Sequence, residues 1–196
     1  MNFLAHLFLA DDTPESMLGN LAGDFVRGSL EDRFEPAIGA AILEHRKIDE
    51  FTDTHREISA FRRVIAADHR HYASVISDVF LDYFLSSDWH LYSDEPREEF
   101  IARVFRTLDP LIDRMPGHLP FVYERMRDGG WLQSYAAVRG IETALRNVSR
   151  RFTRPVRLDA AVHLLGDCRD ELQTRSRAFF PEVIAFARGL RIRSIS

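Results

Sequence analysis

Apolar residues recur every three or four positions along most of this chain, and clean two-residue alternation between turn signals is missing. A spacing near 3.6 residues puts apolar side chains on one face of a helix, whereas a half-buried strand needs a period of two. The pattern therefore predicts an all-α fold. The predicted helices span residues 2–10, 15–27, 36–51, 56–67, 70–87, 95–114, 119–127, 135–148 and 158–187.

Helix starts and connections are marked by Pro14, Pro36, Pro96, Pro116 and Pro155, and Gly129–Gly130 marks a turn. Pro110 lies inside 95–114 and is expected to kink or end that helix. Two apolar stripes have the spacing of core positions: Phe100, Val104, Phe105, Leu108, Leu111 and Ile112, and then Leu158, Ala161, Leu165, Cys168 and Leu172.

Length and composition predict one domain over residues 1–196, a single-domain helical bundle. The chain is 45% hydrophobic, which is enough for one sizeable core. A net charge of −4 gives no overall basic field, so we expect no nucleic-acid partner. The single cysteine, Cys168, excludes an internal disulfide and is expected to be a buried, inert thiol.

The segment MNFLAHLFLADD has no basic leader and no small-residue cleavage site, so we expect no signal peptide. No stretch reaches the roughly 18–20 uncharged apolar residues that a membrane-spanning helix needs, and we expect no membrane association. These features predict a cytoplasmic protein.

The sequence contains two polar pairs whose members lie one helical turn apart: His45 with Asp49 in HRKID, and Asp78 with Asp82 in DVFLD. Residues four apart share a helix face, so two helices can aim these four side chains at one point. Asp53 extends the first row by one turn. Two further polar residues, His6 and Asp24, interrupt the apolar segments NFLAHLFLA and GNLAGDFVRG, where burial is costly without a partner. A divalent cation would pair with all of them.

Ordinary structural roles remain open for each of these residues. His45 and Asp49 also fit a solvated helix face. Asp78 and Asp82, set among apolar neighbours, need either a cation or an arginine such as Arg46 or Arg62 between them. His6 alone is compatible with a hydrogen-bonded core histidine, and Asp24 alone with a helix cap.

An oxygen-rich set of His and Asp with a single cysteine favours manganese, magnesium or iron over structural zinc. Such a centre activates water and neutralises charge on a phosphoryl group. The sequence contains no phosphate-binding glycine loop, G-x-S-x-G elbow, H-E-x-x-H motif or dinucleotide fingerprint.

Several motifs together resemble the acyl carrier protein phosphodiesterase family: MNFLAHLFLA, GNLAGDFVRG, HRKID with FTD, DVFLDYFL followed by Trp89, and WLQSY. The similarity runs from Met1 to about Pro181 and is most specific in the first ninety residues. That family resembles a divergent branch of the all-helical HD phosphohydrolases, which hold a catalytic metal with His and Asp. The resemblance implies an HD-domain-like fold and a manganese ion, although this chain has no adjacent His-Asp dipeptide.

The resemblance implies hydrolysis of the phosphodiester that joins 4′-phosphopantetheine to a serine of holo-acyl carrier protein. The expected metal ligands are Asp24, His45, Asp49, Asp78 and Asp82, and the expected catalytic residues are His6, Asp24 and His45. His6 serves either as a ligand or in proton transfer. The expected substrate-binding residues are Arg27, Arg46, Lys47 and Asp53, with the two arginines on phosphate oxygens.

Acyl carrier proteins are strongly acidic, so an acidic hydrolase needs a local basic surface to receive one. The sequence offers residues 45–47, Arg56 and Arg62–Arg63 for this role. Two rival functions remain open. An HD-like hydrolase of nucleotides or other small phosphoesters would need no docking surface, and a helical binding module would hold no metal and release no product.

Overall fold

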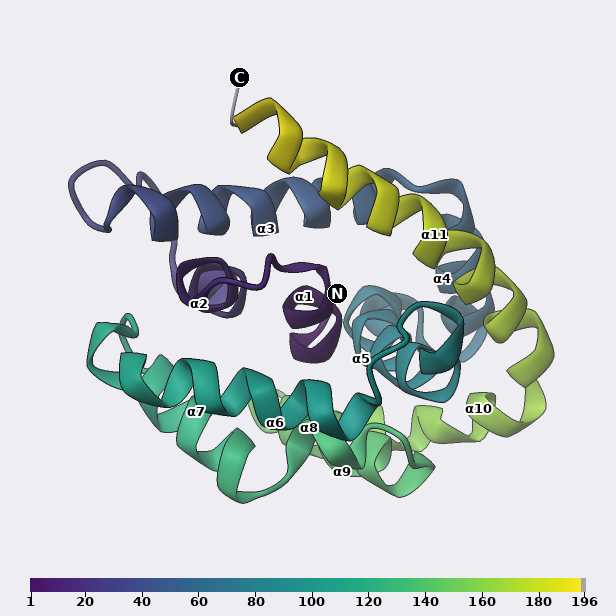
Figure 1. The fold of residues 1–196 in the computed structure, drawn as a ribbon. Coiled ribbons are helices and arrows are strands. Elements are labelled where there is room, and N and C mark those ends of the chain that lie inside the picture. The colour runs from purple at the N-terminus through teal and green to yellow at the C-terminus, as the bar shows by residue number, and fades with distance from the viewer. Residues whose placement is uncertain (195–196) are drawn as a thin grey trace.

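A short apolar helix, α1 (Phe3–Leu9), lies at the centre of the fold between two groups of helices (Figure 1). Six of its seven side chains are buried, His6 among them. Because a helix that is apolar on every side must be covered on every side, this segment is surrounded by the rest of the chain. It packs against α2 (Pro14–Ala22) and α5 (Ala73–Ser87).

The computed structural model describes residues 1–194, and within them the prediction of an all-α fold is confirmed. On one side of α1 lie α3 (Pro36–Thr54) and α11 (Arg169–Ser194), and on the other lie α6 to α9 (Figure 1). The bounds of the remaining α-helices are α4 (Arg56–His69), α6 (Arg97–Leu108), α7 (Leu119–Asp128), α8 (Trp131–Ser134), α9 (Val138–Ser149) and α10 (Leu164–Asp167).

Short 3₁₀ turns join several of these helices: η1 (Gly23–Phe25), η2 (Arg70–Tyr72), η3 (Trp89–Leu91), η4 (Asp109–Arg114) and η5 (Leu158–His163). One contiguous apolar core runs through the described residues. Edge-to-face packing of Phe61 on Phe84, with ring centroids 5.9 Å apart, joins α4 to α5 in that core. None of the described helices combines the length and the hydrophobicity that crossing a bilayer requires.

The C-terminal third of the chain corrects one prediction. The predicted helix 158–187 is divided into η5, α10 and α11, and the break before α11 falls at Cys168. Cys168 is partly exposed, so its predicted place among the buried residues is wrong. The apolar spacing misleads here because 3₁₀ and α turns both bring residues three apart onto one face. The helix predicted over 95–114 ends as an α-helix at Leu108, beside Pro110, as the proline predicts.

Gly19 lets α2 approach α3 closely. A Cβ at this position would lie 2.3 Å from Cβ of Ala41 and 2.8 Å from the carbonyl oxygen of Ile38. Only glycine therefore fits this helix crossing without displacing backbone. The close approach also brings η1, which follows α2, alongside the C-terminal half of α3.

Candidate metal centre

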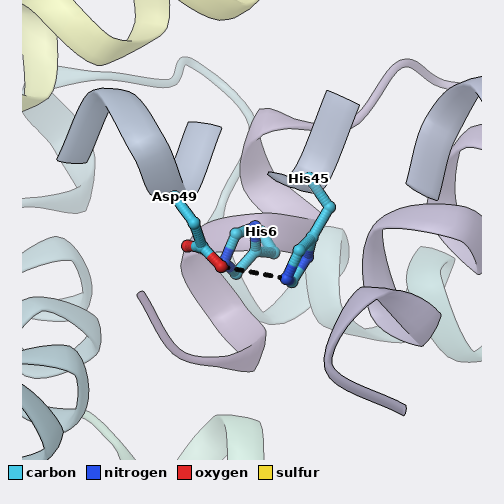
Figure 2. Close-up of side chains that lie close together, drawn as sticks. All are labelled: His6, His45 and Asp49. Carbon is cyan, nitrogen blue, oxygen red and sulfur yellow. Dashed lines mark ion pairs between the residues drawn. The ribbon is translucent and has the colours of Figure 1, made fainter. Parts of the chain in front are cut away.

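His6 from α1 meets His45 and Asp49 from α3 at the centre of the fold, and the three side chains point toward one another (Figure 2). One possible ligand atom from each lies within 4.8 Å of the others. The two oxygens of Asp49 divide between the imidazoles: Oδ1 lies 3.1 Å from Nε2 of His6, and Oδ2 lies 3.1 Å from Nε2 of His45. The two rings stack with centroids 3.7 Å apart.

The ring of His45 is held in one orientation by α2 and η1. Its Nδ1 donates a hydrogen bond to the carbonyl oxygen of Asn20 over 2.8 Å. This contact leaves Nε2 facing the carboxylates, which is how a backbone carbonyl commonly fixes a metal-binding histidine. Behind the ring, a Cβ on Gly23 would lie 2.2 Å from Cγ of His45, so glycine is required where η1 passes it.

Two carboxylates make His45 unusually basic. Asp24 on η1 places Oδ1 3.5 Å from Nε2 of His45, opposite Asp49. Burial disfavours the imidazolium, but its contacts with Asp24 and Asp49 outweigh burial and raise the pKa of His45 to about 9. Against the same burial effect, His45 lowers the pKa of both carboxyl groups. The centre therefore holds one positive charge on His45 between two carboxylates.

His6 is buried without the hydrogen bonds that a core histidine normally makes. Its side chain is 2% exposed, Nδ1 has no hydrogen-bond partner among the described residues, and Nε2 has only the ion-pair contact with Oδ1 of Asp49 at 3.1 Å. Burial, together with the charge on His45, lowers the pKa of His6 to about 4. A buried neutral imidazole with one nitrogen unpaired and the other facing a carboxylate has the composition of a metal ligand, because buried polar atoms are otherwise nearly always paired.

Asp78 from α5 lies at the edge of this cluster, near two positively charged groups, the α-ammonium of Met1 and the guanidinium of Arg62. The α-ammonium of Met1 lies 3.2 Å from Oδ1 of Asp49 and 3.5 Å from Oδ1 of Asp78. Arg62 places Nη2 2.7 Å from Asp53 and 3.7 Å from Asp78. Burial raises the pKa of Asp78 in spite of both cations. Arg62, one of the arginines named from sequence as a partner for this carboxylate, is therefore within ion-pair distance of Asp78.

Asp82 has contacts that differ from the ligand role predicted for it. It is fully buried, and its two oxygens accept hydrogen bonds from the backbone N–H groups of Leu4 and Ala5, each over 3.0 Å. These donors belong to the first turn of α1, and no other group in the described part of the chain accepts from them. Burial raises the pKa of Asp82 to about 7, although both hydrogen bonds oppose the shift. Asp82 therefore anchors the helix that carries His6.

A cavity of about 590 Å³ opens beside the cluster, with four carboxylates on its wall. Its lining residues are Met1, Asn2, Phe3, Asp24, Phe25, Asp49, Asp53, Ser74, Val75, Asp78, Val79, His118, Val148 and Arg151. A phosphodiester is itself an anion, so it needs positive charge in such a cavity to balance these acids.

Of the predicted substrate-binding residues, Asp53 lines this cavity. Arg46 instead directs its guanidinium to the carbonyl oxygens of Val26 and Gly28, at 3.0 and 3.1 Å, where it holds the chain after η1. Lys47 lines a different cavity, beside Leu43, and Arg27 is exposed outside the cavity lining.

The cavity also contains two residues that sequence reasoning passed over, His118 before α7 and Arg151 after α9. The ring of His118 packs edge-on against Phe25, with centroids 5.0 Å apart. Neither residue belongs to a periodic polar pair, and both reach the cavity through long-range folding. The only signal for Arg151 is the run of arginines around it.

An all-helical fold that brings two buried histidines and a part-exposed aspartate together beside an acidic cavity defines a protein with a candidate metal centre. Comparison with known proteins places the chain more closely: it belongs to the acyl carrier protein phosphodiesterase family, whose model matches residues 1–183. A relative so named from Yersinia enterocolitica is 32% identical over 98% of this chain and all of its own length. One from Escherichia coli is 34% identical over 95% of this chain and 97% of its own. No solved structure matches.

Proposed function

We propose that this chain is a metal-dependent phosphodiesterase that removes 4′-phosphopantetheine from the serine of holo-acyl carrier protein in the cytoplasm. Membership of the acyl carrier protein phosphodiesterase family supports the reaction and the carrier substrate. The observation that supports the metal is the buried imidazole of His6, whose Nδ1 has no partner among the described residues and whose Nε2 faces Asp49 beside His45. The products are apo-acyl carrier protein and free 4′-phosphopantetheine.

The residues present fit a divalent cation. His6, His45 and Asp49 are the proposed ligands, and Asp24 and Asp78 are the carboxylates that complete the surrounding charge. Two imidazoles with carboxylate oxygens suit manganese, and they also admit magnesium or iron. When bound, the cation supplies an activated water and balances charge on the phosphoryl oxygens.

The protein residues contribute position and charge to this chemistry. Asn20 fixes the tautomer of His45, and Asp82 fixes the helix that carries His6. His6 lies behind the cavity wall rather than on it, so we assign it as a ligand and not as the group that passes a proton to substrate. Hydrolysis adds the hydroxyl of water to phosphorus, breaks the bond from phosphorus to the serine oxygen, and leaves a proton on that oxygen.

The test is intact-protein mass spectrometry of holo-acyl carrier protein incubated with the chain, with manganese or with chelator. We expect loss of the phosphopantetheine mass with manganese and an unchanged carrier with chelator. An unchanged carrier under every metal and pH tried would overturn the reaction, whereas equal turnover in chelator would overturn the metal.

The variant Asp49→Asn examines the ligand set directly. Its amide cannot supply the anionic oxygens that lie 3.1 Å from both imidazoles, so we expect loss of turnover and of tight manganese binding with unchanged helicity. Asp113→Asn removes an exposed carboxylate remote from the cluster and serves as the matched control. Wild-type turnover in Asp49→Asn would remove Asp49 from the site.

A further inference from the structure

Basic residues are concentrated in one short segment of this acidic chain. Five of the twelve residues from 146 to 157 are arginine, and none of the twelve is acidic. All five arginines are exposed. They follow one another from the last turns of α9 into the loop before η5. Such a density of charge costs electrostatic free energy unless a partner of opposite sign offsets it.

Internal ion pairs account for the two ends of this segment but not for its middle. Arg146 and Arg157 lie 3.6 and 3.0 Å from Asp159. Among the described residues, no carboxylate forms a salt bridge with Arg150, Arg151 or Arg154. We name the middle, residues 150–154, the arginine loop. Its charges are available to a partner.

The arginine loop has a fixed base. The backbone N–H of Leu158 donates to Oγ of Ser149 over 3.2 Å, which closes the chain around the loop. The ring of Phe152 packs edge-on against Tyr72 with centroids 5.3 Å apart, yet Phe152 remains 37% exposed. Arginine and a part-exposed aromatic residue are the types most enriched where proteins bind proteins.

The loop adjoins the candidate metal centre through Arg151. This residue lines the acidic cavity together with Asp49 and Asp78. Its neighbours Arg150, Phe152 and Arg154 line a separate groove of about 560 Å³. The positive surface therefore begins at the wall of the cavity and continues outward along the loop.

The basic residues predicted for docking from sequence are mostly engaged within the protein. Arg46 binds two backbone carbonyls, and Arg62 is held between Asp53 and Asp78. Arg56 lies within 4 Å of both Glu57 and Glu182. Arg63 is exposed, and none of the described carboxylates forms a salt bridge with it.

We propose that the arginine loop is the docking surface for the acidic face of the carrier protein, with Arg150, Phe152 and Arg154 contacting the carrier and Arg151 beside the phosphodiester. This inference rests on the proposed carrier substrate. Opposite charge at the rim of a site accelerates productive encounter and fixes orientation. An anionic carrier that approaches four cavity carboxylates needs such a surface on its path.

The decisive experiment measures binding without turnover. Apo-acyl carrier protein is titrated into the wild-type chain and into Arg150→Glu/Arg154→Glu, at about 50 and about 300 mM salt. We expect the double variant to bind about tenfold or more weakly at low salt and to lose most of the salt dependence. The matched control, Arg56→Glu/Arg63→Glu, makes the same change in net charge on the surface predicted from sequence. It is expected to bind within about twofold of wild type.

Wild-type affinity in the loop variant, or equal weakening in the control, would overturn the proposal. Phe152→Ala tests the surface without changing its charge and is expected to weaken binding several-fold at both salt concentrations. Circular dichroism confirms that each variant is folded, and a misfolded double variant would be replaced by Arg154→Glu alone.

Turnover separates failure of the docking surface from failure of the proposed function. A short peptide that carries phosphopantetheine on serine presents the same phosphodiester without the acidic carrier surface. If docking uses the loop, Arg150→Glu/Arg154→Glu raises KM for holo-carrier much more than KM for the peptide. An equal rise for both substrates would overturn the docking role, whereas a wild-type chain inactive on both would overturn the function instead.

Discussion

The positive charge of His45 balances the negative charge of the carboxylates in the candidate site. Its Nδ1 is committed to Asn20, and its Nε2 lies between Asp24 and Asp49. In the metal-free protein these carboxylates raise the pKa of His45 to about 9, so the imidazole is charged at neutral pH. A metal requires the neutral imidazole, and the cation therefore takes the place of a proton.

Manganese binding is accordingly expected to release about one proton per ion at neutral pH and to tighten as pH rises toward 9. Calorimetry in two buffers of different ionisation enthalpy measures the proton count directly. His45→Gln, which has no proton to release, is expected to bind weakly and without this pH dependence. Affinity that stays constant from neutral pH to 9 in the wild-type chain would contradict the assignment of His45 as a ligand.

Among the helices, α1 depends on α5 for its first turn. Asp82 accepts hydrogen bonds from two backbone N–H groups of α1. No other described residue accepts from them, because Asn2 at the start of α1 makes no side-chain cap. In Asp82→Asn, the side-chain oxygen can still accept one of these hydrogen bonds. The side-chain NH2 group cannot accept the other, so one buried backbone N–H loses its partner. We expect a loss of about 1–3 kcal/mol in the free energy of unfolding, the cost of one unsatisfied buried group.

Urea denaturation followed by circular dichroism measures that loss, with Asp113→Asn as the control for removal of an exposed carboxylate. The control is expected to change stability by less than about 0.5 kcal/mol. Equal stability of Asp82→Asn and the wild-type chain would show that the two hydrogen bonds contribute nothing to holding α1.

Within single elements, the sequence predicted well. The spacing of His45 and Asp49 correctly put both on one face of α3, and the polar interruptions at His6 and Asp24 correctly marked positions near it. The same spacing in α5 placed Asp78 and Asp82 together, yet the two contact different neighbours. Periodicity specifies which residues share a helix face, but packing decides what each part of that face meets.

Between elements, the sequence predicted less. It indicated a centre built mainly from α3 and α5, whereas the closest cluster joins α3 to α1. His118 and Arg151 line the cavity but come from distant parts of the chain. No local sequence pattern predicts that they lie there. The division of residues 158–187 was equally hidden, because it depends on turn geometry and not on apolar spacing.

For the whole molecule, the candidate site lies where the central helix meets one of the groups of helices around it. His6 belongs to α1, and His45 and Asp49 belong to α3 (Figures 1 and 2). A cation bound by all three residues would link these elements in the folded chain. The unfolded chain holds no such arrangement, so binding must shift the equilibrium toward the folded state.

Manganese at a hundred times its dissociation constant is therefore expected to raise the free energy of unfolding by about 2.7 kcal/mol, and excess chelator to reverse the gain. Thermal and urea unfolding of the wild-type chain and of Asp49→Asn provide the comparison. The variant keeps both imidazoles but lacks the carboxylate between them, so manganese is expected to leave its stability nearly unchanged. An equal gain in Asp49→Asn would place the cation elsewhere. No gain in the wild-type chain would mean that no cation links α1 to α3.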